Sequence, residues 1–200
     1  METAINFLNS IGPLDETLNE YLISAFKTET LPKNHIIVRE GNVAKTIGFI
    51  ETGIVRSYTF DHKGNEHSAY FMRKNDVFTA VWSFFQQLPS WETVETLEPS
   101  VIHFLTFDQV QRILREHPYF YFHQARLLLK YYLMNAEREH MRERGGAERI
   151  KYLMENYADL VGPVMDKYLA SFLSMTPQHF SKLKNEYLRD NGKNRKKGKR

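Results

Sequence analysis

The sequence of 200 residues contains no cysteine. Disulfide bonds, thiol nucleophiles, cysteine-ligated zinc and iron–sulfur clusters are therefore excluded. No apolar run is long enough to span a bilayer, and the first residues carry acidic side chains without a basic segment. Neither a membrane helix nor a signal peptide is expected, so the default expectation is a cytoplasmic protein with no membrane partner.

Positive charge is missing from one long segment and concentrated in another. No Lys or Arg occurs between Asn75 and Gln111. Residues 166–200 carry ten Lys or Arg and three Asp or Glu, a balance of +7, whereas residues 1–165 carry −4. A cationic end of this kind favours contact with a polyanion, although a charged tail also serves solubility.

The first half of the chain predicts short strands that follow a helical N-terminal segment at residues 5–27. Apolar and polar residues alternate within residues 35–41, 47–61, 67–80 and 100–108, and turn-forming residues separate these runs. Short strands in close succession, with no helices between them, indicate an antiparallel sandwich, jelly roll or barrel.

Residues 118–144 follow a long helical pattern that ends at Gly145-Gly146. Spacings of three and four residues alternate along one face, as in a coiled-coil seam made of Phe122, Ala125, Leu129, Tyr132 and Ala136. A second apolar stripe beside it contains Leu127, Tyr131 and Met134. Because a helix with two apolar faces needs two partners, we expect a homodimer through the first stripe. The alternative is a helix that is buried within a single chain.

The C-terminal part predicts two short helices that meet at a tight turn within DKYLASFLSMTPQHFSKL, residues 166–183. Pro177 does no harm if it opens the second helix, with Thr176 as the N-cap. Phe180 and Leu183 would anchor this helix against apolar residues of the first, which are Leu169, Phe172 and Leu173. The outer face is then polar and consists of Gln178, His179, Ser181, Lys182 and Lys184. This spacing suits a recognition helix in the major groove, although helical hairpins with polar outer faces are also common elsewhere.

This order of parts resembles the cyclic-AMP receptor protein/FNR family of bacterial transcription regulators. The resemblance covers nearly the whole chain and includes Gly41, IGFIETGIV with Gly53, Lys63-Gly64-Asn65, Asn75-Asp76, Ala170-x-x-x-Ser174 and TPQHFSKLK. It implies an α+β protein with an antiparallel jelly-roll β-roll, a long dimerisation helix and a C-terminal helix-turn-helix domain. The expected domains are 1–116 for the β-roll sensor, 117–144 for the dimerisation helix, 145–190 for the DNA-binding domain and 191–200 for a basic, disordered tail.

The resemblance also implies a role for each polar residue of the second helix. Gln178 and Lys182 fall where the family reads bases, with Ser181 between them, and Thr176, His179 and Lys184 fall nearer the phosphates. Double-stranded DNA is the expected partner. RNA polymerase and an unidentified small-molecule effector are further partners that the resemblance allows. Paired glycines at 145 and 146 would act as the hinge that transmits an effector signal.

Three positions depart from the family pattern. Ser174 replaces the usual glycine of the turn, where a left-handed backbone is less favourable for serine. Pro177 stands where some family members carry a base-reading arginine. A winged hairpin should follow the recognition helix, but NGKNRKKGKR is too short and polar to make a convincing one.

Cyclic-nucleotide binding by the usual route is not expected. Family members that bind these ligands use a Gly-Glu pair and an arginine, whereas this chain has Thr79-Ala80-Val81 and Leu88-Pro89-Ser90-Trp91 in those places. Burial of a phosphate without a cation is costly. Three aromatic residues of this segment are candidates to line an apolar ligand pocket, although such residues more often simply pack the roll and the long helix: Trp82, Phe85 and Trp91.

Catalytic residues, cofactors and metal ions are not implied. The histidines of the predicted strands are scattered and form no His-x-His pair, and no phosphate-binding loop or nucleophile motif occurs. The alternative function is a cupin-like small-molecule binder or metal enzyme whose C-terminal helices do not bind DNA. A third reading is a sensor that dimerises but has lost both its ligand and DNA.

Overall fold

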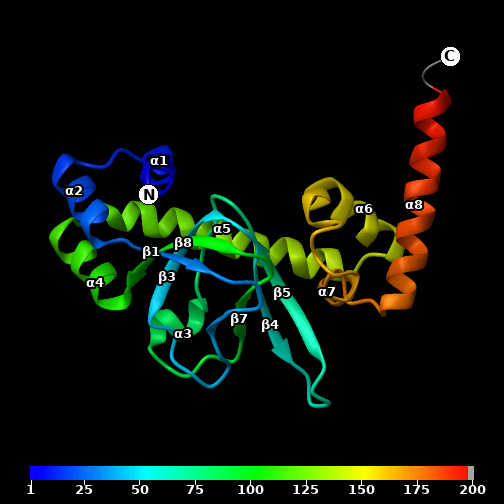
Figure 1. Ribbon diagram of the computed structural model, residues 1–200, viewed down its shortest axis with the longest axis horizontal. Coiled ribbons are helices and arrows are strands. Elements are labelled where there is room, and N and C mark those ends of the chain that lie inside the picture. The colour runs from blue at the N-terminus through cyan, green and yellow to red at the C-terminus, as the bar shows by residue number, and fades with distance from the viewer. Residues whose placement is uncertain (198–200) are drawn as a thin grey trace. The chain divides into compact units, whose positions relative to one another are not determined.

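The computed structural model describes residues 1–197, with side chains described as far as residue 190. The chain forms two compact units (Figure 1). The N-terminal unit contains residues 1–64 and 69–132, and the C-terminal unit contains residues 65–68 and the chain from Leu133 onward. Among the described residues, none of the helices has the length and apolar character that crossing a membrane requires.

Two four-stranded sheets make the body of the N-terminal unit, as the sequence predicted (Figure 1). The first sheet has the order β1-β8-β3-β6, with β1 Lys27–Leu31, β8 Ser100–Thr106, β3 Thr46–Thr52 and β6 Val77–Phe78. The second has the order β2-β7-β4-β5, with β2 Ile36–Val38, β7 Thr93–Thr96, β4 Val55–Phe60 and β5 Glu66–Met72. The strands bury an apolar core that includes Ile50, Val55, Val94 and Ile102.

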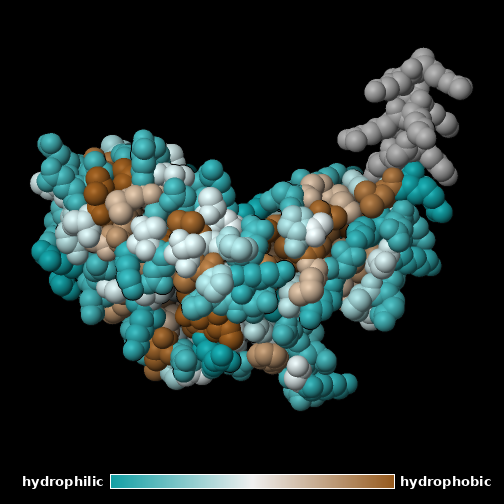
Figure 2. Space-filling model, viewed as in Figure 1, coloured by the Kyte–Doolittle hydropathy of each residue, from teal (hydrophilic) through white to brown (hydrophobic). Residues whose placement is uncertain are grey.

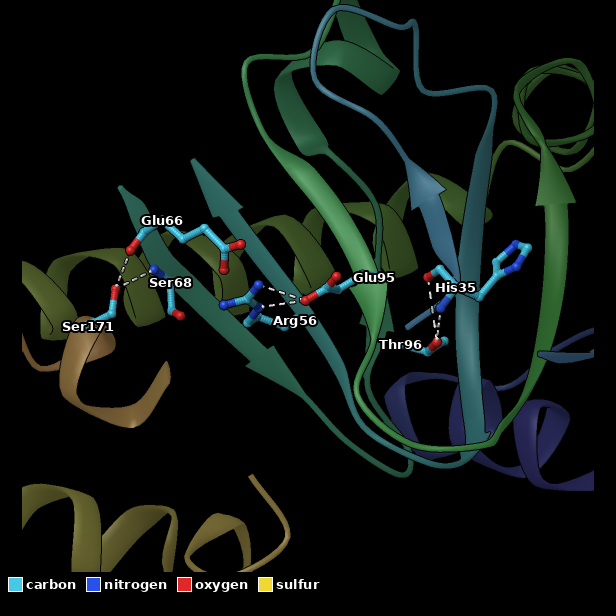
Figure 3. Close-up of polar contacts among 7 residues, drawn as sticks. All are labelled: His35, Arg56, Glu66, Ser68, Glu95, Thr96 and Ser171. Atoms are coloured by element: carbon cyan, nitrogen blue, oxygen red, sulfur yellow. Dashed lines mark hydrogen bonds and ion pairs between the residues drawn. The ribbon is translucent and has the colours of Figure 1, made fainter. Parts of the chain in front are cut away.

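Two of these strands, β1 and β7, are missing from the prediction based on sequence. The sequence of β7, TVET, shows no apolar alternation, yet all four residues are buried because β7 lies between β2 and β4. Its threonines bond to backbone groups of neighbouring loops. Thr96 Oγ1 accepts from His35 N at 2.9 Å (Figure 3). The same hydroxyl donates to Pro32 O at 2.6 Å. Polar residues that find backbone partners can thus occupy a central strand.

Gly53 is the turn residue that the fold most clearly requires. Its φ is +106°, in the left-handed region, and a Cβ here would lie 2.1 Å from Ser100 Oγ. The turn between β3 and β4 therefore accepts no side chain, in agreement with the turn predicted at this point.

A buried ion pair links β4 to β7. Arg56 is fully buried and lies opposite Glu95 in the strand register. Its Nη2 and Nε donate to Glu95 Oε1 at 2.6 and 3.0 Å, and its guanidinium lies 4.0 Å from the centre of the Tyr58 ring (Figure 3). Loss of either residue would leave the other as a buried, unpaired charge, and the desolvation of that charge would destabilise the folded protein.

Helices cover the N-terminal unit on several sides. Helix α1 (Glu2–Ile11) packs on β3 through Phe7 and Phe49, whose ring centres are 5.4 Å apart. Below it, buried His103 places Nε2 2.5 Å from Glu51 Oε2 and Nδ1 2.8 Å from Thr28 Oγ1. Burial lowers the pKa of His103, so this ring is neutral at pH 7 and its contacts are hydrogen bonds.

Three further helices belong wholly to this unit: α2 (Glu16–Ala25), α3 (Val81–Gln86) and α4 (Phe107–Glu116). Helix α5 (Phe120–Arg142) begins in this unit and ends in the C-terminal unit. Helix α4 begins with a capping box between Thr106 and Gln109. Helix α5 begins two residues after Pro118, close to the predicted start. Its second apolar stripe faces the sheets as expected, with the Tyr131 ring 5.4 Å from Tyr70.

The C-terminal unit is built from α6 (Gly146–Asn156), the short 3-10 helix η1 (Ala158–Leu160), α7 (Asp166–Phe172) and α8 (Pro177–Lys197). Its core consists of side chains with no exposure to solvent, namely Ile150, Leu153, Leu160, Leu169, Leu173 and Phe180. Residues 65–68 belong to this unit by their contacts: Ser171 Oγ donates to Glu66 O and accepts from Ser68 N, each at 2.9 Å (Figure 3).

Helix α8 is longer than the sequence predicted. The backbone remains helical through Lys197, where the sequence indicated a disordered tail from residue 191, and residues 198–200 of that tail lie outside the described chain. Within residues 1–197 no strand follows β8, so the described chain contains no winged hairpin after α8.

We expect Arg56→Met to lower the free energy of unfolding of the N-terminal unit by about 3–5 kcal/mol, because Glu95 would be left as a buried charge. The double variant Arg56→Met/Glu95→Leu should recover most of this loss, since neither charge then remains. Both tryptophans, Trp82 and Trp91, lie in this unit, so tryptophan fluorescence during urea titration reports on it alone. A single variant as stable as the wild type would show that the pair is not needed.

Candidate nucleic-acid interface

The turn between α7 and α8 follows the predicted pattern. Ala170, at the predicted crossing point, is fully buried, and Phe180 is fully buried in the core that the two helices share. Phe172 and Leu173 of the first helix are buried as well, whereas Leu183 is half-buried. Burial of a phenylalanine side chain contributes roughly 1.5–3 kcal/mol, so Phe180 is the main anchor of α8.

Local backbone chemistry sets the start of α8. Thr176 Oγ1 accepts from His179 N at 3.2 Å, which makes Thr176 the predicted N-cap, and Pro177 is the first helical residue. Before it, Ser174 adopts φ +54°, the left-handed conformation expected where the family usually has glycine. Met175 N donates to Ala170 O at 2.9 Å across this turn, the long bond of a Schellman motif.

The polar residues of α8 divide into an exposed set and an enclosed one. Thr176, Gln178, His179 and Lys182 are exposed, and Ser181 is half-buried. In the part of the chain with described side chains, Lys182 makes no ion pair. The helix therefore presents an amide, an imidazole and an ammonium group to solvent in its first two turns, next to the positive end of its dipole.

Lys184 does not point outward as the sequence suggested. Its ammonium group is hydrogen bonded to the carboxylate of Asp166, the first residue of α7, and its side chain is largely enclosed. The predicted outer face assumed that Lys184 follows Lys182 onto the same surface. Its ion pair with Asp166 instead holds the Lys184 side chain against α7.

Helix α6 supports α8 from behind. Gly146, in the first turn of α6, lies so close to α8 that a Cβ there would come within 2.7 Å of Leu183 Cδ1 and 2.9 Å of His179 Nε2. Its neighbour Gly145 has an ordinary φ of −64° and nothing within 4 Å of a Cβ position. The two glycines, predicted together as a hinge, thus have different surroundings, and Gly146 is needed for close packing.

A second aromatic cluster lies beneath α7. The Tyr157 ring packs edge-on against Phe172 at 5.5 Å and against Tyr152 at 5.9 Å between ring centres. Burial raises the pKa of Tyr152, so its hydroxyl stays neutral at any physiological pH. This cluster and Phe180 hold the two ends of the helix-turn-helix unit to α6 and η1.

The predicted dimer seam lies on the open side of α5. All five of its residues are exposed in the single chain: Phe122, Ala125, Leu129, Tyr132 and Ala136. Tyr121, Leu128 and Leu133 enlarge the apolar strip. Figure 2 shows that apolar residues, in brown, also interrupt the hydrophilic surface on the side from which Figure 1 is viewed. An exposed apolar strip of this length on one helix indicates an interaction surface.

The predicted ligand-pocket residues are not brought together in an enclosed cavity. Trp82 and Trp91 are 37% and 56% exposed and stack on each other with ring centres 4.2 Å apart. Phe85 is half-buried next to Phe84. At the place where an arginine would hold a cyclic phosphate, the buried Ser90 Oγ donates to the backbone oxygen of Glu92 at 2.8 Å. Among the described residues, no three His, Cys, Asp or Glu side chains lie close enough to form a metal site.

Comparison with known proteins agrees with this architecture. Residues 28–117, which include the strands of the β-roll from β2 to β8, match the family model of the cyclic nucleotide-binding domain. FixK2 from Bradyrhizobium japonicum superposes with a TM-score of 0.73 at 16% identity, covering 84% of this chain and 86% of that chain. The chain has the fold of the cyclic-AMP receptor protein/FNR regulators. No curated protein sequence matches it.

Two further solved structures share this fold. The c-di-GMP-responsive global regulator CLP of Xanthomonas campestris has a TM-score of 0.71 at 12% identity, with 88% of this chain and 93% of that chain covered. DNR from Pseudomonas aeruginosa has a TM-score of 0.54 at 22% identity, with 94% and 87% covered. The resemblance read from the sequence is therefore confirmed at the level of the fold.

Sequence reasoning missed two arginines. Arg56 lies in a strand predicted correctly, but a lone arginine between apolar residues gives no sign that Glu95 lies opposite it. Arg149 of α6 donates to backbone oxygens of the α7–α8 turn, and its distance of 24 residues from Leu173 hid that contact. Both depend on strand or helix pairing that only the folded chain provides.

We expect Gly146→Ala to destabilise the C-terminal unit by about 1 kcal/mol and to displace the His179 ring, because the new methyl group needs the space that this ring and Leu183 occupy. Gly145→Ala is the matched control and should change stability by less than about 0.5 kcal/mol. Differential scanning calorimetry gives the stability, and the ¹H–¹⁵N spectrum of the imidazole gives the ring environment. Equal effects of the two substitutions would contradict the close-packing role of Gly146.

Proposed function

We propose that this protein is a sequence-specific, DNA-binding transcription regulator of the cyclic-AMP receptor protein/FNR type, acting as a homodimer. The observation that carries the proposal is the first half of α8, where buried Phe180 fixes the helix while Gln178, His179 and Lys182 project into solvent. A fixed helix with a polar, cationic outer face suits the major groove of DNA. The fold that the chain shares with known regulators supports the same conclusion.

Each exposed residue has a distinct role in this proposal. Gln178 suits adenine and Lys182 suits guanine, because their donors and acceptors match the major-groove edges of those bases. Thr176, His179 and the first backbone N–H groups of α8 would contact phosphates. Ser181 lies between the two base-reading positions. Lys184 would reach a phosphate only after leaving Asp166, so we assign it a supporting contact at most.

The homodimer follows from the two faces of α5. One face is occupied by the N-terminal unit through Tyr131, while Lys130 holds Asp76 at 2.8 Å. The other face carries the exposed apolar seam and is free to pair with the same seam of a second copy. Two recognition helices in such a dimer would address half-sites about 34 Å apart.

The effector of the β-roll is not cyclic AMP bound by the usual route. The segment from Asn75 to Gln111, which contains Ser90, has no Lys or Arg to offer a phosphate, and the buried Arg56 is already engaged by Glu95. The stacked Trp82 and Trp91, with half-buried Phe85 of the same segment, are our candidate contact for a planar apolar effector. RNA polymerase is the further partner expected of a DNA-bound regulator.

We expect Gln178→Ala and Lys182→Ala each to weaken binding to the preferred DNA site by roughly tenfold, the loss of about one base contact. The preferred site is first obtained by selecting genomic fragments with the purified protein, and affinity is then measured by fluorescence anisotropy at two salt concentrations. Neither variant should change the salt slope by as much as the roughly 0.9 that one phosphate contact contributes, because both residues are assigned to bases.

Lys151→Ala is the control for this experiment, because it removes an exposed lysine of α6 whose ion-pair partner is Glu155. It should leave specific affinity unchanged. If the wild-type protein selects no DNA, or if both α8 variants bind the site as tightly as the wild type, the regulator proposal is wrong.

We expect Leu129→Glu to convert the dimer to a monomer, because the charge would be buried against its counterpart in the partner's seam. Ile23→Glu is a closely matched control, since Ile23 of α2 and Leu129 are both 47% exposed in the single chain. Sedimentation velocity should give a monomer for the first variant and a dimer for the second. The monomeric Leu129→Glu variant should bind a DNA with two half-sites roughly a hundredfold or more weakly than the wild type, because its two DNA-binding units are no longer linked to each other.

A further inference from the structure

The turn that precedes α8 depends on an unfavourable backbone conformation. Ser174 has φ +54°, and a residue with a Cβ is disfavoured there. Two backbone bonds close the turn: Ser174 N donates to Ser171 O and Met175 N donates to Ala170 O, both at 2.9 Å. Similar bonds close glycine-containing turns, so they do not by themselves offset the strain of serine.

Arg149 adds a contact that the turn alone does not have. Its Nη1 donates to Leu173 O at 2.6 Å and to Ser174 O at 3.1 Å. These two oxygens converge at the C-terminus of α7, where the helix dipole is negative and a cation is favoured. The shorter bond runs to the fully buried Leu173, and the arginine side chain is itself half-buried.

Arg149 makes both contacts in the observed turn, in which Ser174 is left-handed. A change of the backbone angles at Ser174 would move the Ser174 carbonyl relative to that of Leu173, and one nitrogen would then no longer be in place for both oxygens. Charge-assisted hydrogen bonds to a cation are stronger than neutral ones. Arg149 therefore favours the conformation that serine disfavours.

We propose that Arg149 is the positioning residue of the recognition helix, holding the Ser174 turn in the place of the glycine that this chain lacks. Helix α8 begins three residues after Ser174. A change of the backbone angles at Ser174 therefore changes the orientation of α8, and with it the direction in which Gln178 and Lys182 point. Arg149 touches neither base nor phosphate in this role. The inference rests on the proposed DNA-binding function, and it also makes a claim about the turn that holds without DNA.

The experiment compares Arg149→Met, Arg149→Lys, Ser174→Gly and the double variant Arg149→Met/Ser174→Gly, with Lys151→Met as the control. Lys151 is an exposed cation of the same helix whose partner is Glu155, so its loss removes one positive charge without touching the turn. Amide hydrogen exchange at Ser174 and Met175 reports opening of the turn. Affinity for the selected DNA site at two salt concentrations reports positioning of α8.

In Arg149→Met, both amides should exchange at least about tenfold faster, and specific DNA affinity should fall at least about tenfold with an unchanged salt slope, since no phosphate contact is lost. Ser174→Gly in the same background should bring both values back to within about threefold of the wild type, because glycine adopts the left-handed angles freely. Arg149→Lys should lie between, because an ammonium group lacks the fixed geometry of guanidinium. Lys151→Met should match the wild type.

Unchanged exchange in Arg149→Met, or a failure of Ser174→Gly to restore it, would overturn the proposal. A reduced salt slope would do the same, because it would make Arg149 a phosphate contact. If Arg149→Met does not fold, Arg149→Lys and the double variant decide the question. If the wild type selects no DNA, the proposed function fails by itself, and the exchange rates still show whether Arg149 holds the turn.

Discussion

The burial of Phe180 against α7 is the contact on which the rest of the C-terminal unit depends. It fixes the rotation of α8 about its own axis and so decides that Gln178, His179 and Lys182 face solvent. The other local devices serve the same end: the Thr176 cap starts the helix, Gly146 lets α6 approach it, and Arg149 secures the turn before it. Each acts through van der Waals contact or hydrogen bonding at short range, so together they define one position of the helix.

Charge is arranged differently in the two units. In the N-terminal unit, the segment from Asn75 to Gln111 contains no Lys or Arg, and the buried Arg56 is paired with Glu95. In the C-terminal unit, Lys182 of α8 is exposed, whereas Lys184 pairs with Asp166 and Arg189 lies 3.9 Å from Asp190.

Helix α5 connects these properties because its two apolar stripes have different partners. The stripe through Tyr131 packs on the roll, and the stripe through Leu129 is exposed on one chain alone. A second copy of the chain would cover the exposed stripe and pair the two recognition helices. A signal from the roll then has one continuous helix through which to act, since α5 runs without a break from Phe120 to Arg142.

The sequence by itself determined most of the strands, the long helix, the α7–α8 turn with its cap at Thr176 and the apolar seam, because these depend on local spacing, turn residues and side-chain periodicity. The left-handed position at 174 was implied by the family resemblance. The sequence did not reveal β7, whose threonines are buried only because two strands flank them, or the ion pair of Arg56 with Glu95. It also placed Lys184 on the outer face and read Gly145 and Gly146 as equivalent. Those outcomes were decided by tertiary structure, because each depends on a group far along the chain whose distance in space no local pattern encodes.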